Sequence, residues 1–152
     1  MARLSKPPFI CLVAALCLCP TLAWAQWDIQ HVPATPQSSA SLEISYRSSG
    51  ERLSIVCSHG IGLVSFSPGY RMLPSTLLVE GIYRVDAEPP RPLRWRISGN
   101  LALVAAPDTQ RLLSDLTGAT KVFFSFAGVE QTYDLTPLRQ RSELIHEACN
   151  IE

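Results

Sequence analysis

Apolar and polar residues alternate along the chain after Ser41, and this period of two restricts the fold more than any other feature. Three successive runs show it: Ser41 to Tyr46, Leu53 to Cys57, and Ile61 to Phe66. The short polar segments "RSSGER" and "SHG" separate the runs. Because successive side chains of a strand point to opposite faces, the pattern predicts short antiparallel strands with one buried face.

The remainder of the chain adds strands and two helices to this pattern. Strands are expected at Thr76–Asp86 (with a bulge at Gly81), Leu93–Ile97, Leu101–Val104, Thr120–Phe126 and Gln131–Leu135. A helix capped by Asp108 and ending at Gly118 is expected, and a last helix capped by Thr136 reaches Cys149. The predicted fold is mainly β: an antiparallel sandwich or barrel-like sheet of about eight strands, with one short inserted helix and a C-terminal helix.

The first 25 residues have the pattern of a cleavable signal peptide. Arg3 and Lys6 precede a short apolar run, and Ala23-Trp24-Ala25 has the small residues that signal peptidase requires. We therefore expect export to the periplasm and three segments. These are a signal peptide (1–25), a lead-in anchored by Trp27 (26–40) and a single β-rich domain with a C-terminal helix (41–152).

Composition argues against two classes of partner. All 13 acidic residues lie after the signal, whereas loss of Arg3 and Lys6 leaves 11 of the 13 basic residues, so the net charge falls to about −2. This is not the basic surface of a nucleic-acid-binding protein. No apolar segment after the signal is long enough to cross a membrane.

Signal cleavage reduces five cysteines to two, Cys57 and Cys149. An even pair in an exported chain favours a disulfide over the alternative of two free buried thiols. Cys149 lies on the apolar stripe of the last helix, and Cys57 follows the buried positions of its strand. A bond between them would be structural, and closing so long a loop would stabilise the fold by roughly 4 kcal/mol.

The sequence offers no catalytic or metal-binding constellation. His31, His59 and His146 lack the spacing of a metal site, and no Gly-x-Ser-x-Gly elbow is present. The glycines Gly60 and Gly62 do not belong to a phosphate-binding loop. We therefore expect no cofactor and no enzymatic activity.

Two groups of residues are candidates for binding. The first is the cluster "RPLRWR", in which Arg91, Arg94 and Arg96 surround Trp95. On a strand, Arg94 and Arg96 share the face opposite Trp95, where they would bind an anionic partner. The alternative is a solvated face paired with nearby acids such as Asp86 or Glu88.

The second group lies in the loop Ser67–Pro74. Tyr70 and Met72 are expected to be exposed there, because loops carry contact residues disproportionately. The tryptophans Trp27 and Trp95 are more simply core residues than contact residues.

The order of motifs resembles a known family. A tryptophan soon after the signal precedes "LSIVC"; "IYRVD" is followed by a double proline and a tryptophan, and "YDL" leads into a helix that ends in cysteine. This order is similar to that of the small exported VasI/TagO-like proteins associated with bacterial type VI secretion. The matching residues are Trp27, Cys57, Tyr83, Asp86, Trp95, Asp134 and Cys149.

The resemblance implies a non-catalytic accessory protein of the cell envelope, whose partners are secretion-system components, and it implies that the matching residues maintain the scaffold. The chain differs from the family pattern at Phe66, where tryptophan is expected, and at Thr136, where glycine is expected. A second hypothesis is a periplasmic inhibitor of a wall hydrolase such as lysozyme, with the Ser67–Pro74 loop entering the active cleft. A third is an enzyme acting on peptidoglycan.

Overall fold

The computed structural model of the chain describes residues 26–72 and 78–151, and this part of the chain forms one antiparallel sheet with three short helices. The strands are β1 (Gln26–Val32), β2 (Ser41–Ser48), β3 (Glu51–Ser58), β4 (Ile61–Ser67), β5 (Leu78–Val85), β6 (Arg91–Ser98), β7 (Leu101–Val104), β8 (Lys121–Phe126) and β9 (Val129–Asp134). The helices are α1 (Ala106–Gly118), α2 (Thr136–Arg139) and α3 (Ser142–Cys149). The predicted class, a mainly β barrel-like sheet with helices, is confirmed.

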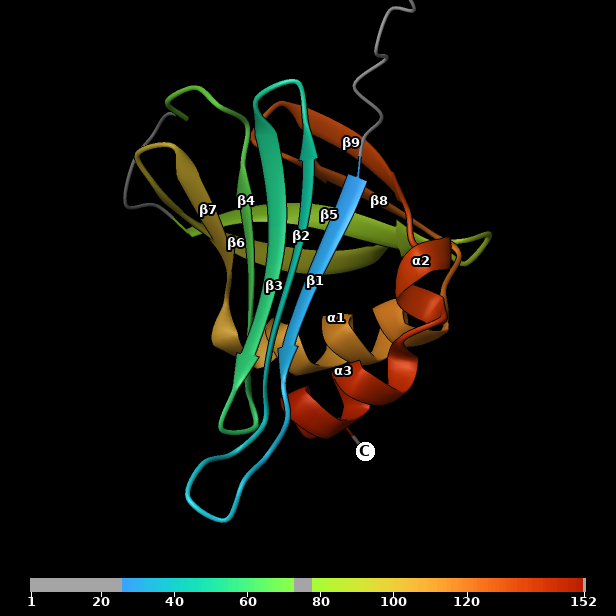
Figure 1. The fold of residues 1–152 in the computed structure, drawn as a ribbon. Coiled ribbons are helices and arrows are strands. Elements are labelled where there is room, and N and C mark those ends of the chain that lie inside the picture. Colours follow the sequence, from blue (N-terminus) through green and yellow to red (C-terminus); the bar gives the residue numbers. More distant parts are fainter. Residues whose placement is uncertain (1–25, 73–77, 152) are drawn as a thin grey trace, which may run out of the picture.

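The sheet curls into a half-barrel with α1 and α3 lying together at one end (Figure 1). Its strand order is β1-β2-β3-β4-β7-β6-β5-β8-β9, and every neighbouring pair is antiparallel. Tight turns join β2 to β3, β3 to β4, β6 to β7 and β8 to β9. The curl gives the sheet a buried inner face and an outer face.

The lead-in expected before Ser41 is instead the first strand of the sheet. β1 pairs with β2 from Gln26–Arg47 to Val32–Ser41. Trp27 and Ile29 point inward and are partly buried against the core. The alternation is hidden in the sequence because polar Asp28 and Gln30 separate only these two apolar residues, as is usual for an edge strand with one solvated face.

Trp27 also connects the two edges of the sheet. Its indole Nε1 donates a hydrogen bond of 2.7 Å to the carbonyl oxygen of Asp134, the last residue of β9. The Trp27 and Tyr133 rings flank that of Tyr46, with ring centroids 5.1 Å and 5.0 Å from it. This aromatic cluster therefore holds together strands that are not neighbours in the hydrogen-bonded sheet.

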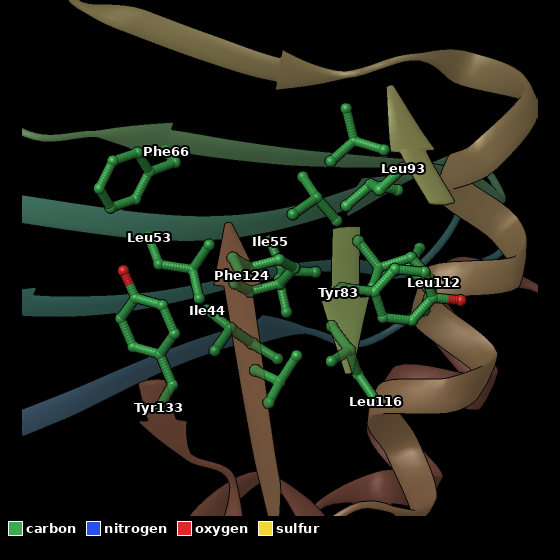
Figure 2. Close-up of a cluster of buried hydrophobic side chains, with 14 of the residues drawn as sticks. Ile44, Leu53, Ile55, Phe66, Tyr83, Leu93, Leu112, Leu116, Phe124 and Tyr133 are labelled. Atoms are coloured by element: carbon green, nitrogen blue, oxygen red, sulfur yellow. The ribbon is translucent and has the colours of Figure 1, made fainter. Parts of the chain in front are cut away.

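The core lies between the inner face and α1. Figure 2 shows Leu112 and Leu116 of α1 beside Tyr83, and the side chains of Leu93 and Leu112 are fully buried. Trp95 is likewise inaccessible and stacks on Phe126, as expected for a core tryptophan. Burial of these apolar side chains is the main stabilising contribution to the fold.

Gly81 is required for the contact between β5 and β8. The sequence suggested a bulge there, but the residue pairs regularly with Leu93 on one side and Phe126 on the other. A Cβ at this position would lie 2.5 Å from both the Cβ of Phe126 and the carbonyl oxygen of Ser125. The glycine therefore permits close packing of the strands.

The start of α1 differs from the prediction. Ala105, not Asp108, is the N-cap, and it makes no side-chain capping bond. Asp108 lies one turn further on, where its carboxylate accepts hydrogen bonds from Arg94 of β6. The contact with Arg94 thus uses the carboxylate of Asp108, which local preference would place at the N-cap.

The predicted C-terminal helix is two helices. α2 ends at Arg139 and α3 begins at Ser142, although neither glycine nor proline marks the break. Thr136 is not the cap either, because its backbone N–H and its hydroxyl both donate to the carboxylate of Asp134. Asp134 therefore terminates β9 and starts α2.

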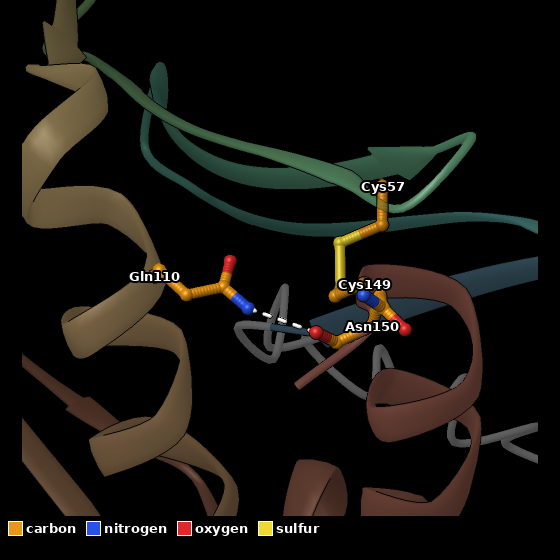
Figure 3. The surroundings of a disulfide bond; sticks show 4 residues. All are labelled: Cys57, Gln110, Cys149 and Asn150. Carbon is orange, nitrogen blue, oxygen red and sulfur yellow. Dashed lines mark hydrogen bonds between the residues drawn. A yellow bond between two sulfur atoms is a disulfide. The ribbon is translucent and has the colours of Figure 1, made fainter. Parts of the chain in front are cut away.

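A disulfide joins Cys57 of β3 to Cys149 of α3, the pairing that we expected (Figure 3). The two Cα atoms are 4.9 Å apart and both side chains are fully buried. Asn150 follows in a left-handed conformation that ends α3, and its carbonyl oxygen accepts a bond of 3.0 Å from Gln110 of α1. The disulfide therefore attaches α3 to the sheet, and the hydrogen bond from Gln110 holds the end of α3 beside α1.

Candidate functional site

The three arginines of the "RPLRWR" cluster have different surroundings, although they lie within one strand. Arg91 and Arg94 form ion pairs with carboxylates of α1. Arg96 is exposed and has no ion-pair partner among residues 26–72 and 78–151. The predicted cluster thus divides into two arginines with structural contacts and one with a free cationic group.

Arg94 is held by Asp108 where β6 extends beyond the end of its neighbour β7. The carboxylate of Asp108 accepts from the backbone N–H of Arg94 at 3.1 Å, from its Nε at 2.9 Å and from its Nη2 at 3.2 Å. Arg111 donates to the carbonyl oxygen of Pro92 at 2.8 Å. Side chains of α1 therefore satisfy backbone groups of β6 that β7 does not reach.

Arg91 belongs to a second contact with α1. Its Nη1 donates to both oxygens of Asp115, at 2.9 Å and 2.8 Å, and Nη2 donates to Glu88 at 2.7 Å. The buried hydroxyl of Tyr83 donates to the same Asp115 carboxylate at 2.5 Å. Arg91 thus pairs with Glu88, one of the two acids named as a partner for the cluster. The other acid, Asp86, makes its hydrogen bonds to Thr120 and Lys121 instead.

Asp86 instead stabilises the turn before β8. Its carboxylate accepts from the backbone N–H groups of Thr120 and Lys121 and from the Thr120 hydroxyl. These hydrogen bonds, chiefly that of the Thr120 hydroxyl, lower the pKa of Asp86. Asp86 therefore holds the scaffold in this structure, by joining the end of β5 to the start of β8.

Two groups in the contacts between α1 and the sheet have pKa values shifted in opposite directions. The hydrogen bond from Arg94 lowers the pKa of the Asp108 carboxyl, against the opposing effect of its burial. Burial raises the pKa of Tyr83, and the hydrogen bond to Asp115 raises it further. Both groups therefore keep their ordinary charge at neutral pH, which is what a structural contact requires.

Arg96 lies in a row of residues that crosses the outer face of the sheet. In that row Ser65 of β4 faces Leu103 of β7, Leu103 faces Arg96, and Arg96 faces Leu78 of β5. Leu78 is 51% exposed, and Leu63, two residues before Ser65, is 44% exposed. Apolar side chains thus flank a free guanidinium on a face that the alternating pattern would leave polar.

These residues line a shallow groove of about 400 Å³, which we call the outer groove. Its lining consists of Leu63, Leu78, Arg94, Arg96, Leu103 and the segment Val104–Pro107. A neighbouring hollow of about 510 Å³ shares Arg94 and includes Glu80, Ile82, Asp108 and Arg111. An apolar lining with a few placed charged groups is typical of a binding site.

The loop candidates are not part of the outer groove. Tyr70 is 58% exposed, as expected, and Arg71 beside it is also exposed. Met72 is only 3% exposed, so its predicted role as an exposed contact is wrong. Its backbone N–H donates to the carbonyl oxygen of Gly99, which fixes the residue against the β6–β7 turn and turns its side chain into the core. Residues 73 and 74 of the loop lie outside the described part.

The histidines lie on separate elements. His31 is on β1, His59 is in the β3–β4 turn with a positive φ of 54°, and His146 is on the exposed side of α3. Within the described ranges no three His, Cys, Asp or Glu side chains lie close enough to hold a metal ion. In the same ranges no helix is long and apolar enough to cross a bilayer.

The sequence did not indicate that the leucines of the outer groove, or Asp108 and Asp115 of α1, belong to this site. Leu63 lies on the outer face of β4, whereas Val64 and Phe66 point into the core. The available signal was that "IGLVSF" has apolar residues in both phases of the alternation. Such a strand buries one phase and exposes the other.

Comparison with family models, curated proteins and solved structures found no match for this chain.

Proposed function

We propose that this chain is an exported, non-catalytic accessory protein that binds another protein in the bacterial cell envelope. The observation that carries the proposal is the outer groove, in which three leucines, two of them exposed, accompany Arg96, a cation with no carboxylate partner in the described ranges. Apolar surface together with arginine is the composition of protein interaction sites.

Other features support an envelope location. The first 25 residues have the composition of a signal peptide, and the Cys57–Cys149 disulfide suits an oxidising compartment such as the periplasm. The resemblance to VasI/TagO-like proteins adds type VI secretion as the process that the protein would serve. Its matching residues Trp27, Asp86 and Asp134 make scaffold contacts, which leaves the outer groove for a partner.

The test is a cross-linking pull-down of the tagged, oxidised protein from its own cell envelope, analysed by mass spectrometry. We expect secretion-system components to be recovered, and a Cys57→Ala/Cys149→Ala variant serves as a control for the folded state. A protein that stays in the cytoplasm with free thiols, or that recovers no envelope protein, contradicts the proposal.

A second candidate is an inhibitor of a cell-wall hydrolase. The observation in its favour is the exposed pair Tyr70 and Arg71, on the loop that was expected to enter an active cleft. If this function is correct, the pure protein slows lysozyme and Tyr70→Ala weakens the effect. Unchanged lysozyme turnover at micromolar protein would exclude it.

A further inference from the structure

We infer that the outer groove binds an amphipathic helix of the partner protein, with an apolar stripe on the leucines and carboxylates at Arg96. This inference rests on the proposed binding function and adds the chemical nature of the partner. It is carried by three properties of the groove: exposed apolar side chains, an unpaired cation and the absence of free backbone groups on a sheet face.

The apolar contribution comes from three strands. Leu63, Leu78 and Leu103 belong to β4, β5 and β7, and all three project from the outer face. Leu63 and Leu78 are 44% and 51% exposed, so much of their apolar surface is available for burial by a partner. Burial of such surface is favourable and needs no particular geometry.

The charged contribution comes from Arg96. Arg94 already donates to Asp108, so its position is fixed and its charge is compensated. Arg96 has the row neighbours Leu103 and Leu78, and no acidic side chain among the described residues pairs with it. A carboxylate of the partner would therefore complete a charge-assisted hydrogen bond beside the leucines.

The position of the groove on a sheet face favours a helix over an extended segment. An added strand binds through unpaired backbone groups at a sheet edge, whereas β7 and β6 already pair with neighbours on both sides at Leu103 and Arg96. A helix packed on the face of a sheet is one of the recurring layered arrangements of protein folds. Four neighbouring strands span roughly 14 Å, which is the length of a helix of about nine residues.

The experiment uses a labelled helical peptide of about 14 residues with leucines at helical spacing and flanking glutamates, and a matched peptide with glutamine in their place. Binding to the oxidised protein is measured by fluorescence anisotropy. We expect the glutamate peptide to bind at least roughly tenfold more tightly than the glutamine peptide, and Arg96→Glu to remove that preference.

The matched control is Arg84→Glu, which makes the same charge change on the outer face of β5 but outside the groove. Arg84 lies over the Phe123 ring, 5.6 Å from its centroid. Equal binding of the two peptides overturns the inference, and so does an equal loss in both variants, because it indicates a general charge effect. Self-association of the protein through the groove, lost in Arg96→Glu, would also overturn it.

A second measurement separates this inference from the proposed function. A photo-cross-linking residue is introduced at Leu103 in cells, and the captured peptide is sequenced. An envelope partner cross-linked through a segment that is not an acidic amphipathic helix leaves the function intact and overturns the inference. Selective binding of the glutamate peptide without any envelope partner leaves the inference intact and contradicts the function.

Discussion

The helices α1 and α3 are attached to the same sheet in different ways. α3 is joined covalently, through Cys149 to Cys57, and packs with Ile145 against the core. α1 packs Leu112 and Leu116 into the core and is held in addition by two carboxylates, Asp108 and Asp115, which bind arginines of β6. Beyond the apolar packing that both helices share, the attachment of α3 depends on oxidation and that of α1 on ionisation, so different conditions should weaken them.

The difference also explains the distribution of positive charge. Asp108 and Asp115 are seven residues apart and lie on the same side of α1, which lets them reach Arg94 and Arg91 along one strand. Arg96 lies near the start of the helix, in the groove that Ala106 and Pro107 also line, and it has no ion pair within the described ranges. Two of the three arginines are therefore paired with carboxylates of α1, and the third lies in the outer groove.

The largest effect is expected from removal of the disulfide. The Cys57→Ala/Cys149→Ala variant should lose about 4 to 5 kcal/mol of unfolding free energy, because the bond closes a loop of 92 residues. Urea unfolding measures this loss, and reduction of the wild-type protein should give a similar value. If hydrogen exchange shows that α1 opens before α3 in the reduced protein, the comparison is wrong.

The next effect concerns Asp115. Asp115→Ala should cost about 2 kcal/mol, because the hydroxyl of Tyr83 is fully buried and loses its acceptor. Tyr83→Phe in the same chain removes the unpaired hydroxyl and should restore part of the stability. Thermal unfolding of both single variants and the double variant measures the coupling; additive losses would show that the contact is not used.

A smaller effect is expected from pH. The pKa of Asp108 is lower in the folded chain than in the unfolded chain. Its contribution is therefore complete above about pH 4 and is lost as the pH falls through the folded pKa. Between pH 6 and pH 3 the wild type should lose more stability than Asp108→Asn, by on the order of 1 kcal/mol, discounted because Arg94 is 43% exposed.

Urea unfolding at the two pH values tests this expectation, with Asp108→Asn as the reference for all other titrating groups. Asp86 and Asp134 also have lowered pKa values, so both proteins lose stability in acid. Parallel losses in the two proteins would mean that the ion pair to Arg94 does not stabilise the attachment of α1.

The smallest effect is expected at Arg96. Arg96→Ala should change stability by less than about 0.5 kcal/mol, because an exposed side chain without a partner contributes little. Arg94→Ala should cost about 1 to 2 kcal/mol, since buried Asp108 would lose its charged donor. Equal losses in the two variants, measured by thermal unfolding, would remove the distinction between fixed and free arginines.

Most of the fold was predictable because it depends on local patterns. The alternation of β2 and β3, the two strands on either side of Gly99 and the end of the helix at Gly118 all appear in the structure. β1 was missed because an edge strand needs few apolar residues. The division of the last helix was missed because no residue type marks the break before Ser142.

The candidate site was predictable only in part. The arginine cluster was visible in the sequence. Its separation into fixed and free members, however, depends on contacts with α1, in which Asp108 lies 14 residues after Arg94. Leu63 and Leu103 are apolar and could not be distinguished from core residues before the register of the sheet was known. The burial of Met72 depends on its contact with Gly99 in the β6–β7 turn, which the loop sequence does not indicate.

By itself, the sequence determined the strand pattern, the cysteine pairing and the class of the fold, because the side-chain period and the apolar faces on which Cys57 and Cys149 lie depend only on residue order. The tertiary structure alone decided which charges are available. Asp108 could have capped its own helix, and it instead binds Arg94 because β6 extends past β7 and leaves a backbone N–H to be satisfied. Arg96 is free because no carboxylate of α1 reaches it.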